Sequence, residues 1–312
     1  MSNRRAFLVN STLAAAAVSI FRPLNGLADI GVQKINLQAR NRLTILHTSN
    51  MYGQLTGLQS HKKMNGLGGL INVHKKINET RNEQVPLLTI HTGNIIGGGD
   101  KSEEEYLQFY KQLNAAGYDA VIPGKSDLLK GAKHFENMSL QSGLKVVAGQ
   151  SNFPGALFPS QVTKKGNNKV GIVQIPFHLP GSSERFSSSY IAGVMNESAL
   201  KLKEIGGCNI VICMVQSGKE ASINLAELSE NIDVILSAVN NHSIHNSMVV
   251  RNKINHEIIV SSAGSKGTMM SRLDFTFNNE GEKISTGSKS IFIGAAEDGS
   301  LAMLKRYKGS VT

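Results

Sequence analysis

The chain has 312 residues, of which 40% are hydrophobic and 18% charged, a composition typical of a soluble globular protein with one large domain or two small ones. It has no tryptophan and few other aromatic residues, so neither a base-stacking platform nor a sugar-stacking surface is indicated. The formal charge is +10, and the lysines are scattered rather than grouped in blocks. This pattern favours a basic, solvated surface over a patch for nucleic acid or anionic membranes.

Residues 1–28 have the features of an export signal. Arg4 and Arg5 precede an apolar stretch, and Gly-Leu-Ala at 26–28 forms a small-x-small cleavage site. The arginine pair resembles a twin-arginine signal, with an ordinary secretory signal or an uncleaved anchor as the alternative. The apolar run is short for a transmembrane helix, so we expect a mature protein that begins near Asp29, lacks a membrane span and is periplasmic or extracellular.

The first half of the chain alternates between strands, glycine-containing loops and helices. We predict strands at 43–46, 85–90 and 119–123, and helices over 70–77 and 102–116. Ser102 and Glu105 have the spacing of a capping box at the start of the second helix. This alternation is typical of βαβ units, in which the loops at the carboxyl ends of the strands bind ligands.

The second half continues with strands and one recognisable helix. Residues 271–277 alternate as an outer antiparallel strand and end in a turn at 278–281. We see no internal repeat or long linker, so we expect one domain from about residue 40 to 300 and a basic tail at 301–312. The remaining predictions are strands at 144–147, 169–175, 209–215, 233–236 and 256–261, and a helix over 198–205.

Two cysteines, Cys208 and Cys213, lie five positions apart in or beside a predicted strand. A strand would separate them by about 16 Å, beyond the roughly 7 Å limit for a disulfide, so we expect buried thiols.

Five segments resemble, in the right order, motifs of the metallophosphoesterase (calcineurin-like) domain of 5′-nucleotidases. Leu-Thr-Ile-Leu-His-Thr at 43–48, followed by Gly53, resembles that family's opening motif L-T-I-L-H-T-N-D-x-H-G. The other four segments are 117–124, 211–213, 231–235 and 271–274. The resemblance implies an α/β fold, a metallophosphoesterase-like sandwich of two mixed sheets flanked by helices in the order α-β-β-α.

The family's enzymes use two divalent metal ions, which polarise a phosphate and generate a hydroxide nucleophile. Each position to which the resemblance assigns a metal ligand or catalytic group holds a different residue type here. The ligand positions are Asn50, Tyr52, Asn94, Lys125, Gln216, Val239 and Asn241, and the catalytic histidine and its partner aspartate fall on Ser126 and Leu129. We therefore predict no catalytic residue, no metal ligand and no bound cofactor at these positions.

Charge supports this prediction. Asn50 and Asn94 offer neutral amide oxygens where the resemblance implies carboxylates. A lysine at position 125, about 5 Å from a divalent ion, would cost about 6 kcal/mol at an effective dielectric near 20. By contrast, Gly53, Gly93, Gly124 and Gly218 remain, where we expect turns that require a residue without a Cβ. This combination is typical of a pseudoenzyme.

Other residues are candidate substitutes for the missing groups. His91, His242 and His245 could form a relocated single-metal site, but a loop histidine pair is more often a solvated surface feature. We expect His47 to have a packing role. Gly97-Gly98-Gly99 lacks the lysine of a phosphate-binding loop, so we interpret it as a flexible loop.

Three functions stay open at this stage. The first is an exported pseudoenzyme that binds a partner or a small anion or nucleotide, with Lys125, Asn50 and Asn94 as the anion-binding residues. By analogy, the partner would be a separate protein with the carboxyl-terminal domain that grips the nucleotide in this family. The second is a metal-dependent phosphoester hydrolase with altered or residual activity. The third is a structural or interaction domain without a ligand.

Overall fold

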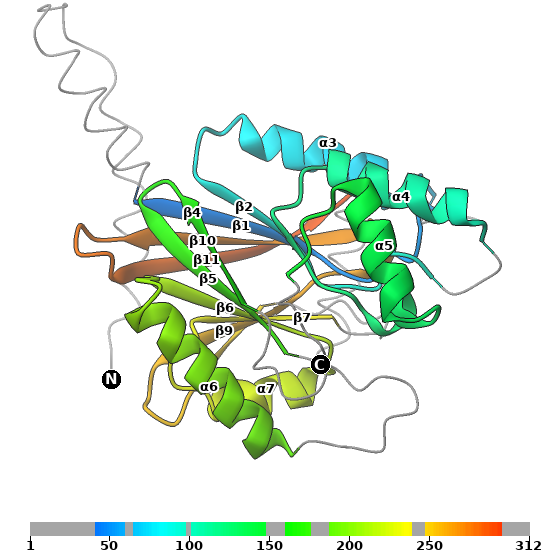
Figure 1. The fold of residues 1–312 in the computed structure, drawn as a ribbon. Helices are drawn as coiled ribbons and strands as arrows, with labels where there is room; N and C mark the ends of the chain where they lie inside the picture. Colours follow the sequence, from blue (N-terminus) through cyan, green and yellow to red (C-terminus); the bar gives the residue numbers. More distant parts are fainter. Residues whose placement is uncertain are drawn as a thin grey trace, which may run out of the picture. The chain divides into compact units, whose positions relative to one another are not determined.

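The computed structural model describes six stretches of the chain, 41–59, 65–97, 101–147, 160–175, 187–238 and 247–294 (Figure 1). The expected export signal at 1–28 and basic tail at 301–312 lie outside these residues and stay predictions. The described strands form two mixed sheets, one of five and one of six strands.

The five-stranded sheet has the order β11-β10-β1-β2-β3. β1, β2 and β3 run parallel, whereas β10 is antiparallel to β1, and β11 to β10. The strands are β1 (Arg42–Thr48), β2 (Leu87–His91), β3 (Ala120–Val121), β10 (Met269–Phe277) and β11 (Lys283–Phe292).

The six-stranded sheet has the order β4-β5-β6-β7-β9-β8. Its four central strands are parallel, and the edge strands β4 and β8 are antiparallel to their neighbours. The strands are β4 (Ser160–Lys165), β5 (Asn168–Gln174), β6 (Ile210–Val215), β7 (Val234–Ser237), β8 (Met248–Arg251) and β9 (Glu257–Ser262).

An apolar core lies between the two sheets. It includes Leu43 and Ile45 of β1 and Ile212 and Met214 of β6, all fully buried. Because side chains alternate along a strand, Leu46 points to the opposite face and packs with the helices there. The sandwich has helices on both outer faces (Figure 1), so the predicted α-β-β-α architecture is confirmed.

Two groups of helices cover these faces. α3 (Leu70–Arg81), α4 (Glu103–Ala115) and α5 (Ala132–Ser142) pack on the five-stranded sheet, and α6 (Ser188–Glu204) and α7 (Lys219–Glu227) pack on the six-stranded sheet. The predicted capping box of α4 is present. The Glu105 amide donates to Ser102 Oγ at 3.2 Å, and the Ser102 amide donates to Glu105 Oε2 at 2.7 Å.

Three predicted elements are wrong in detail. Residues 144–147 contribute only an isolated bridge, between Val121 and Val146. The helix predicted over 198–205 is the second half of α6, which begins at Ser188. β10 is not an outer strand, because β11 pairs along its whole length. β11 has six consecutive exposed residues and therefore lacks the alternation that would have predicted it. The sequence also did not predict α5, α7, β4 and β8.

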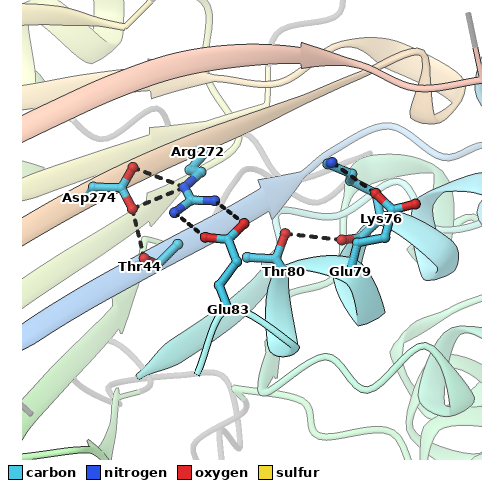
Figure 2. Close-up of polar contacts among 7 residues, drawn as sticks. All are labelled: Thr44, Lys76, Glu79, Thr80, Glu83, Arg272 and Asp274. Carbon is cyan, nitrogen blue, oxygen red and sulfur yellow. Dashed lines mark hydrogen bonds and ion pairs between the residues drawn. The ribbon is translucent and has the colours of Figure 1, made fainter. Parts of the chain in front are cut away.

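Arg272 of β10 connects the sheet to the segment that follows α3 (Figure 2). Its Nη1 and Nη2 donate to the two carboxylate oxygens of Glu83 at 2.8 and 2.7 Å. Its Nε donates to Asp274 at 3.0 and 2.9 Å, and Asp274 also accepts a hydrogen bond of 2.7 Å from Thr44 Oγ1. The Arg272 side chain is 9% exposed, so this network holds β10, β1 and the approach to β2 together.

Candidate functional site

The loops that follow β1 and β2 lie side by side and are joined by backbone hydrogen bonds. The amide of Asn50 donates to Gly93 O at 2.9 Å, that of Tyr52 to Asn94 O at 3.0 Å, and that of Gly53 to Ile95 O at 2.8 Å. Parallel strands end at the same edge of a sheet, and this pairing continues β1 and β2 beyond that edge. The predicted site residues of the two loops are therefore brought together.

Three of these residues have positive φ angles, 52° at Asn50, 50° at Tyr52 and 55° at Asn94. Asparagine adopts this left-handed conformation more readily than most residues, whereas a bulky tyrosine does so rarely. Backbone strain of this kind persists where the surrounding structure enforces it, commonly at functional sites. These two loops therefore have an unusual backbone.

Four side chains form what we call the Asn94 network: Asn50, Asn94, Ser126 and Gln216. Asn94 Nδ2 donates to Asn50 Oδ1 at 2.7 Å and to Gln216 Oε1 at 3.3 Å. Asn94 Oδ1 accepts from both the amide and the hydroxyl of Ser126, each at 3.0 Å. Gln216 Nε2 in turn donates to the carbonyl oxygen of Thr92. Asn50 and Asn94 are buried. The network therefore connects the loops after β1, β2, β3 and β6.

Two glycines permit this close packing. A Cβ at Gly93, which has a φ of 88°, would collide with the side-chain Nε2 of Gln216. A Cβ at Gly124 would collide with Asn94. Gly53 has a φ of 72°, so its predicted conformational role is also confirmed. The prediction for Gly218 is wrong, because its φ is −68° and a Cβ there would meet nothing within 4 Å.

Asp127 is a central residue of the site that sequence reasoning missed. Its carboxylate is buried and accepts hydrogen bonds from the Ile96 amide at 3.0 Å and the Gly124 amide at 2.7 Å. Burial raises its pKa to about 6, although these amides act in the opposite direction. The one sequence signal that could have identified Asp127 is its position three residues after Gly124, because a side chain at that spacing can accept the Gly124 amide.

His47 and His91 are fully buried on β1 and β2. His47 Nε2 lies 3.0 Å from Ser261 Oγ, and His91 Nδ1 lies 2.8 Å from Thr48 Oγ1. Within the part of the chain that the structure describes, neither His47 Nδ1 nor His91 Nε2 has a hydrogen-bond partner. Burial lowers the pKa of each imidazole to about 3, so both are neutral at pH 7.

The other predicted positions are more scattered. Lys125 is exposed, and Leu129 is 58% exposed, so neither joins the Asn94 network. Tyr52 is half-buried, and burial, followed by the nearby charge of Asp127, raises the pKa of its hydroxyl. The cysteines are free and buried, as predicted. Four predicted positions, Val239, Asn241, His242 and His245, lie outside the described residues.

The residues do not fit a dinuclear metal centre. At the matched positions within the described ranges, the side chains are neutral amides, a hydroxyl, a phenol, an exposed ammonium and an alkyl group, and none is a carboxylate or an imidazole. The amide groups of Asn50 and Asn94 are also directed at each other. Across the described residues, no group of three His, Cys, Asp or Glu side chains could hold a metal ion.

Comparison with solved structures identifies the fold. The 5′-nucleotidase precursor of Thermus thermophilus superposes with a TM-score of 0.67 and 17% identity, covering 86% of this chain and 59% of that one. The NAD nucleotidase of Haemophilus influenzae superposes with a TM-score of 0.66 and 17% identity, covering 85% of this chain and 56% of that one. The calcineurin-like phosphoesterase YfkN of Bacillus subtilis superposes with a TM-score of 0.59 and 14% identity, covering 86% of this chain and 97% of that one.

The chain therefore has the calcineurin-like metallophosphoesterase fold. More particularly, it has the fold found in 5′-nucleotidases, so the resemblance read from the sequence is confirmed at the level of fold. The chain spans less than three fifths of the length of the two nucleotidases. No protein-family model matches the sequence. No curated protein matches it either. Among the described helices, none has the length and apolar character needed to cross a membrane.

Proposed function

We propose that this chain is an exported pseudoenzyme of the 5′-nucleotidase and metallophosphoesterase family, and that it acts by binding a partner or a small anion. The observation that carries the proposal is the Asn94 network, in which residues at three of the matched ligand positions bond to one another. A hydrolase of this family would need anionic and imidazole ligands at those positions. The chain supplies amides there instead.

The first experiment measures metal and turnover. We expect the purified mature protein to contain much less than one equivalent of manganese, iron or zinc. We also expect no hydrolysis of an aryl phosphate above the buffer rate when manganese or zinc is added. Stoichiometric metal, or turnover that a chelator abolishes, would contradict the proposal and favour the alternative of a hydrolase with altered or residual activity.

The anion-binding form of the proposal depends on Lys125. Lys125 is exposed, stands in the chain between Gly124 and Ser126 of the Asn94 network, and is the one cation among the predicted binding residues. We expect inorganic phosphate or a nucleotide to raise the melting temperature of the wild type and to have no effect on Lys125→Ala. Lys164→Ala, which alters an exposed lysine of β4, is the control. Equal shifts in Lys125→Ala and the wild type would exclude Lys125 as the anchor.

A protein partner is the other form of the proposal. By analogy with the longer nucleotidases, we propose as partner a separate protein with a domain like the part of those chains that this one does not match. Co-purification of such a protein with the tagged mature chain would support it. If the chain neither retains a protein nor responds to phosphate or nucleotide, a structural domain without a ligand becomes the better interpretation.

Export is part of the proposal and rests on the arginine pair and the apolar stretch of residues 1–28. We expect replacement of Arg4 and Arg5 by lysine to leave the precursor in the cytoplasm. Fractionation of cells followed by immunoblotting measures the distribution. Unaffected export of the lysine variant would identify an ordinary secretory signal instead.

A further inference from the structure

We propose that Asn94 is the hub of a structural lock, which fastens four loops to one another and closes the interior of the site to ligands. The inference rests on the proposed function in one respect, because it assigns no metal ion to positions 50 and 94. It goes beyond that function by stating what the amides at these positions do. It also specifies where a ligand cannot bind.

The Asn94 side chain is fully occupied within the protein. A carboxamide has two N–H donors and an oxygen with two lone pairs, so its capacity is four hydrogen bonds. Asn94 Nδ2 donates to Asn50 and Gln216, and Asn94 Oδ1 accepts two hydrogen bonds from Ser126. The side chain is 2% exposed. No donor of Asn94 is left for an anion.

Further hydrogen bonds to backbone groups hold the same loops in place. Asp127 connects the loop after β3 to the loop after β2, because it accepts the amides of both Gly124 and Ile96. The carbonyl oxygen of Asn50 accepts the Lys266 amide at 2.8 Å, which adds the turn between β9 and β10. A ligand entering between these loops would have to break several of these bonds together. We therefore expect ligands to bind outside these loops, at exposed residues such as Lys125.

Hydrogen exchange tests the lock in the mature protein. In Asn94→Ala, we expect amides in all four loops, 49–53, 92–96, 124–127 and 216–218, to exchange about tenfold faster than in the wild type. Asn196→Ala is the matched control, because its side chain also joins two backbone groups. Asn196 Nδ2 donates to Leu228 O at 3.0 Å, and Asn196 Oδ1 accepts from the backbone amide of Glu230 at 2.9 Å. The control should accelerate exchange only near residues 228–230. Faster exchange confined to 92–96 in Asn94→Ala would overturn the lock.

Milder variants keep the test decisive if Asn94→Ala does not fold. Ser126→Ala and Gln216→Ala each remove one side chain bonded to Asn94, and each should accelerate exchange about threefold in loops other than its own. Acceleration restricted to the substituted loop in both variants would again overturn the lock.

Inorganic phosphate provides a second readout. If phosphate raises the melting temperature, Lys125→Ala should abolish the shift and Asn50→Ala should retain it. A shift that survives in Lys125→Ala and is lost in Asn50→Ala would place the anion inside the site and contradict the lock. These results are separate from the metal measurement, because bound metal would refute the proposed function whatever the exchange pattern.

Discussion

At positions 50 and 94, the difference between a carboxylate and a carboxamide decides how the two side chains interact. Asn50 Oδ1 and Asn94 Nδ2 are 2.7 Å apart. Two carboxylate oxygens at that distance would repel by about 6 kcal/mol at an effective dielectric near 20, unless a cation lay between them. An amide is both donor and acceptor, so Asn50 and Asn94 bond directly. The loops can therefore be held together without a cation.

Asp127 allows a prediction at the same scale. Each of its carboxylate oxygens accepts a backbone amide, and an asparagine there would direct its NH₂ group at one of those donors. We expect Asp127→Asn to lower the free energy of unfolding by about 2–4 kcal/mol at pH 7, which urea denaturation would measure. Asp119→Asn is a less buried control, with an expected loss below about 2 kcal/mol. An Asp127→Asn variant as stable as the wild type would contradict the role given to Asp127.

The buried imidazoles predict sensitivity to acid. Burial lowers the pKa of His47 and His91 to about 3, below the 6.5 of an unfolded histidine. Each therefore contributes stability above pH 6.5 that is lost as the pH falls toward 3. Between pH 7 and pH 5, the contribution of each histidine to the free energy of unfolding falls by about 2 kcal/mol. Asp127 acts in the opposite direction, because its pKa is raised to about 6, and its contribution to stability rises by roughly 1 kcal/mol over the same interval.

These three groups together predict a net loss of about 2–3 kcal/mol between pH 7 and pH 5. Urea denaturation at both pH values measures it. In the double variant His47→Gln and His91→Gln, the dependence should reverse, since Asp127 is the one group of the three that still titrates. Equal losses in the wild type and the double variant would show that other groups control the acid response.

Among the secondary-structure elements, Figure 2 shows the ion pairs that Arg272 forms with Glu83 and Asp274, and the pair of Lys76 with Glu79. Arg272 has a 9% exposed side chain and bonds to both Glu83 and Asp274. Lys76 and Glu79 form a pair on α3, with side chains 33% and 49% exposed. We expect Arg272→Met to cost about 2–3 kcal/mol, because it leaves the buried part of two carboxylates without their partner. Lys76→Met should cost less than about 0.5 kcal/mol.

Chemical denaturation of the two variants gives this comparison directly. If Arg272→Met and Lys76→Met are equally stable, the Arg272 network does not hold β10 to the segment after α3. A second check is the salt dependence, because 1 M NaCl should weaken the Lys76–Glu79 pair more than the contacts of the buried Arg272 side chain.

The sequence predicted most elements of the fold and missed those with weak patterns. β1, β2, β5 and β6 are apolar runs, and α4 begins at a recognisable cap, so each is specified locally. β11 is exposed and rich in serine, and it becomes a strand because β10 offers it an edge.

In the candidate site, residue identity alone showed which chemical groups stand at the matched positions. It did not indicate their bonds to one another, because these join residues up to 122 positions apart.

At the scale of the whole described domain, the core between the sheets predicts one cooperative unfolding transition. Leu43 and Ile45 come from one sheet and Ile212 from the other, and all three are fully buried in the same core. We expect Ile212→Ala to lower the free energy of unfolding by about 2–5 kcal/mol and the transition to stay single. Ile205→Ala, at an 84% exposed position, should change it by less than about 0.5 kcal/mol.

Calorimetry and far-ultraviolet circular dichroism check this prediction. Coincident transitions with one midpoint are expected for the wild type and for Ile212→Ala. Two separated transitions in either protein would mean that the sheets unfold independently, which a shared core does not allow.

Apolar periodicity and residue identity are local properties, so the order of residues indicated an α/β protein and the chemical group at each matched position, whereas the α-β-β-α order followed from the motif resemblance. How those positions are used depends on the folded chain. Only the folded chain brings Asn50, Asn94, Ser126 and Gln216 from four separate loops within hydrogen-bond distance, and only burial raises the pKa of Asp127 and lowers those of His47 and His91. The physical reason is that hydrogen-bond partners and desolvation depend on neighbours in space, which the order of residues along the chain does not give.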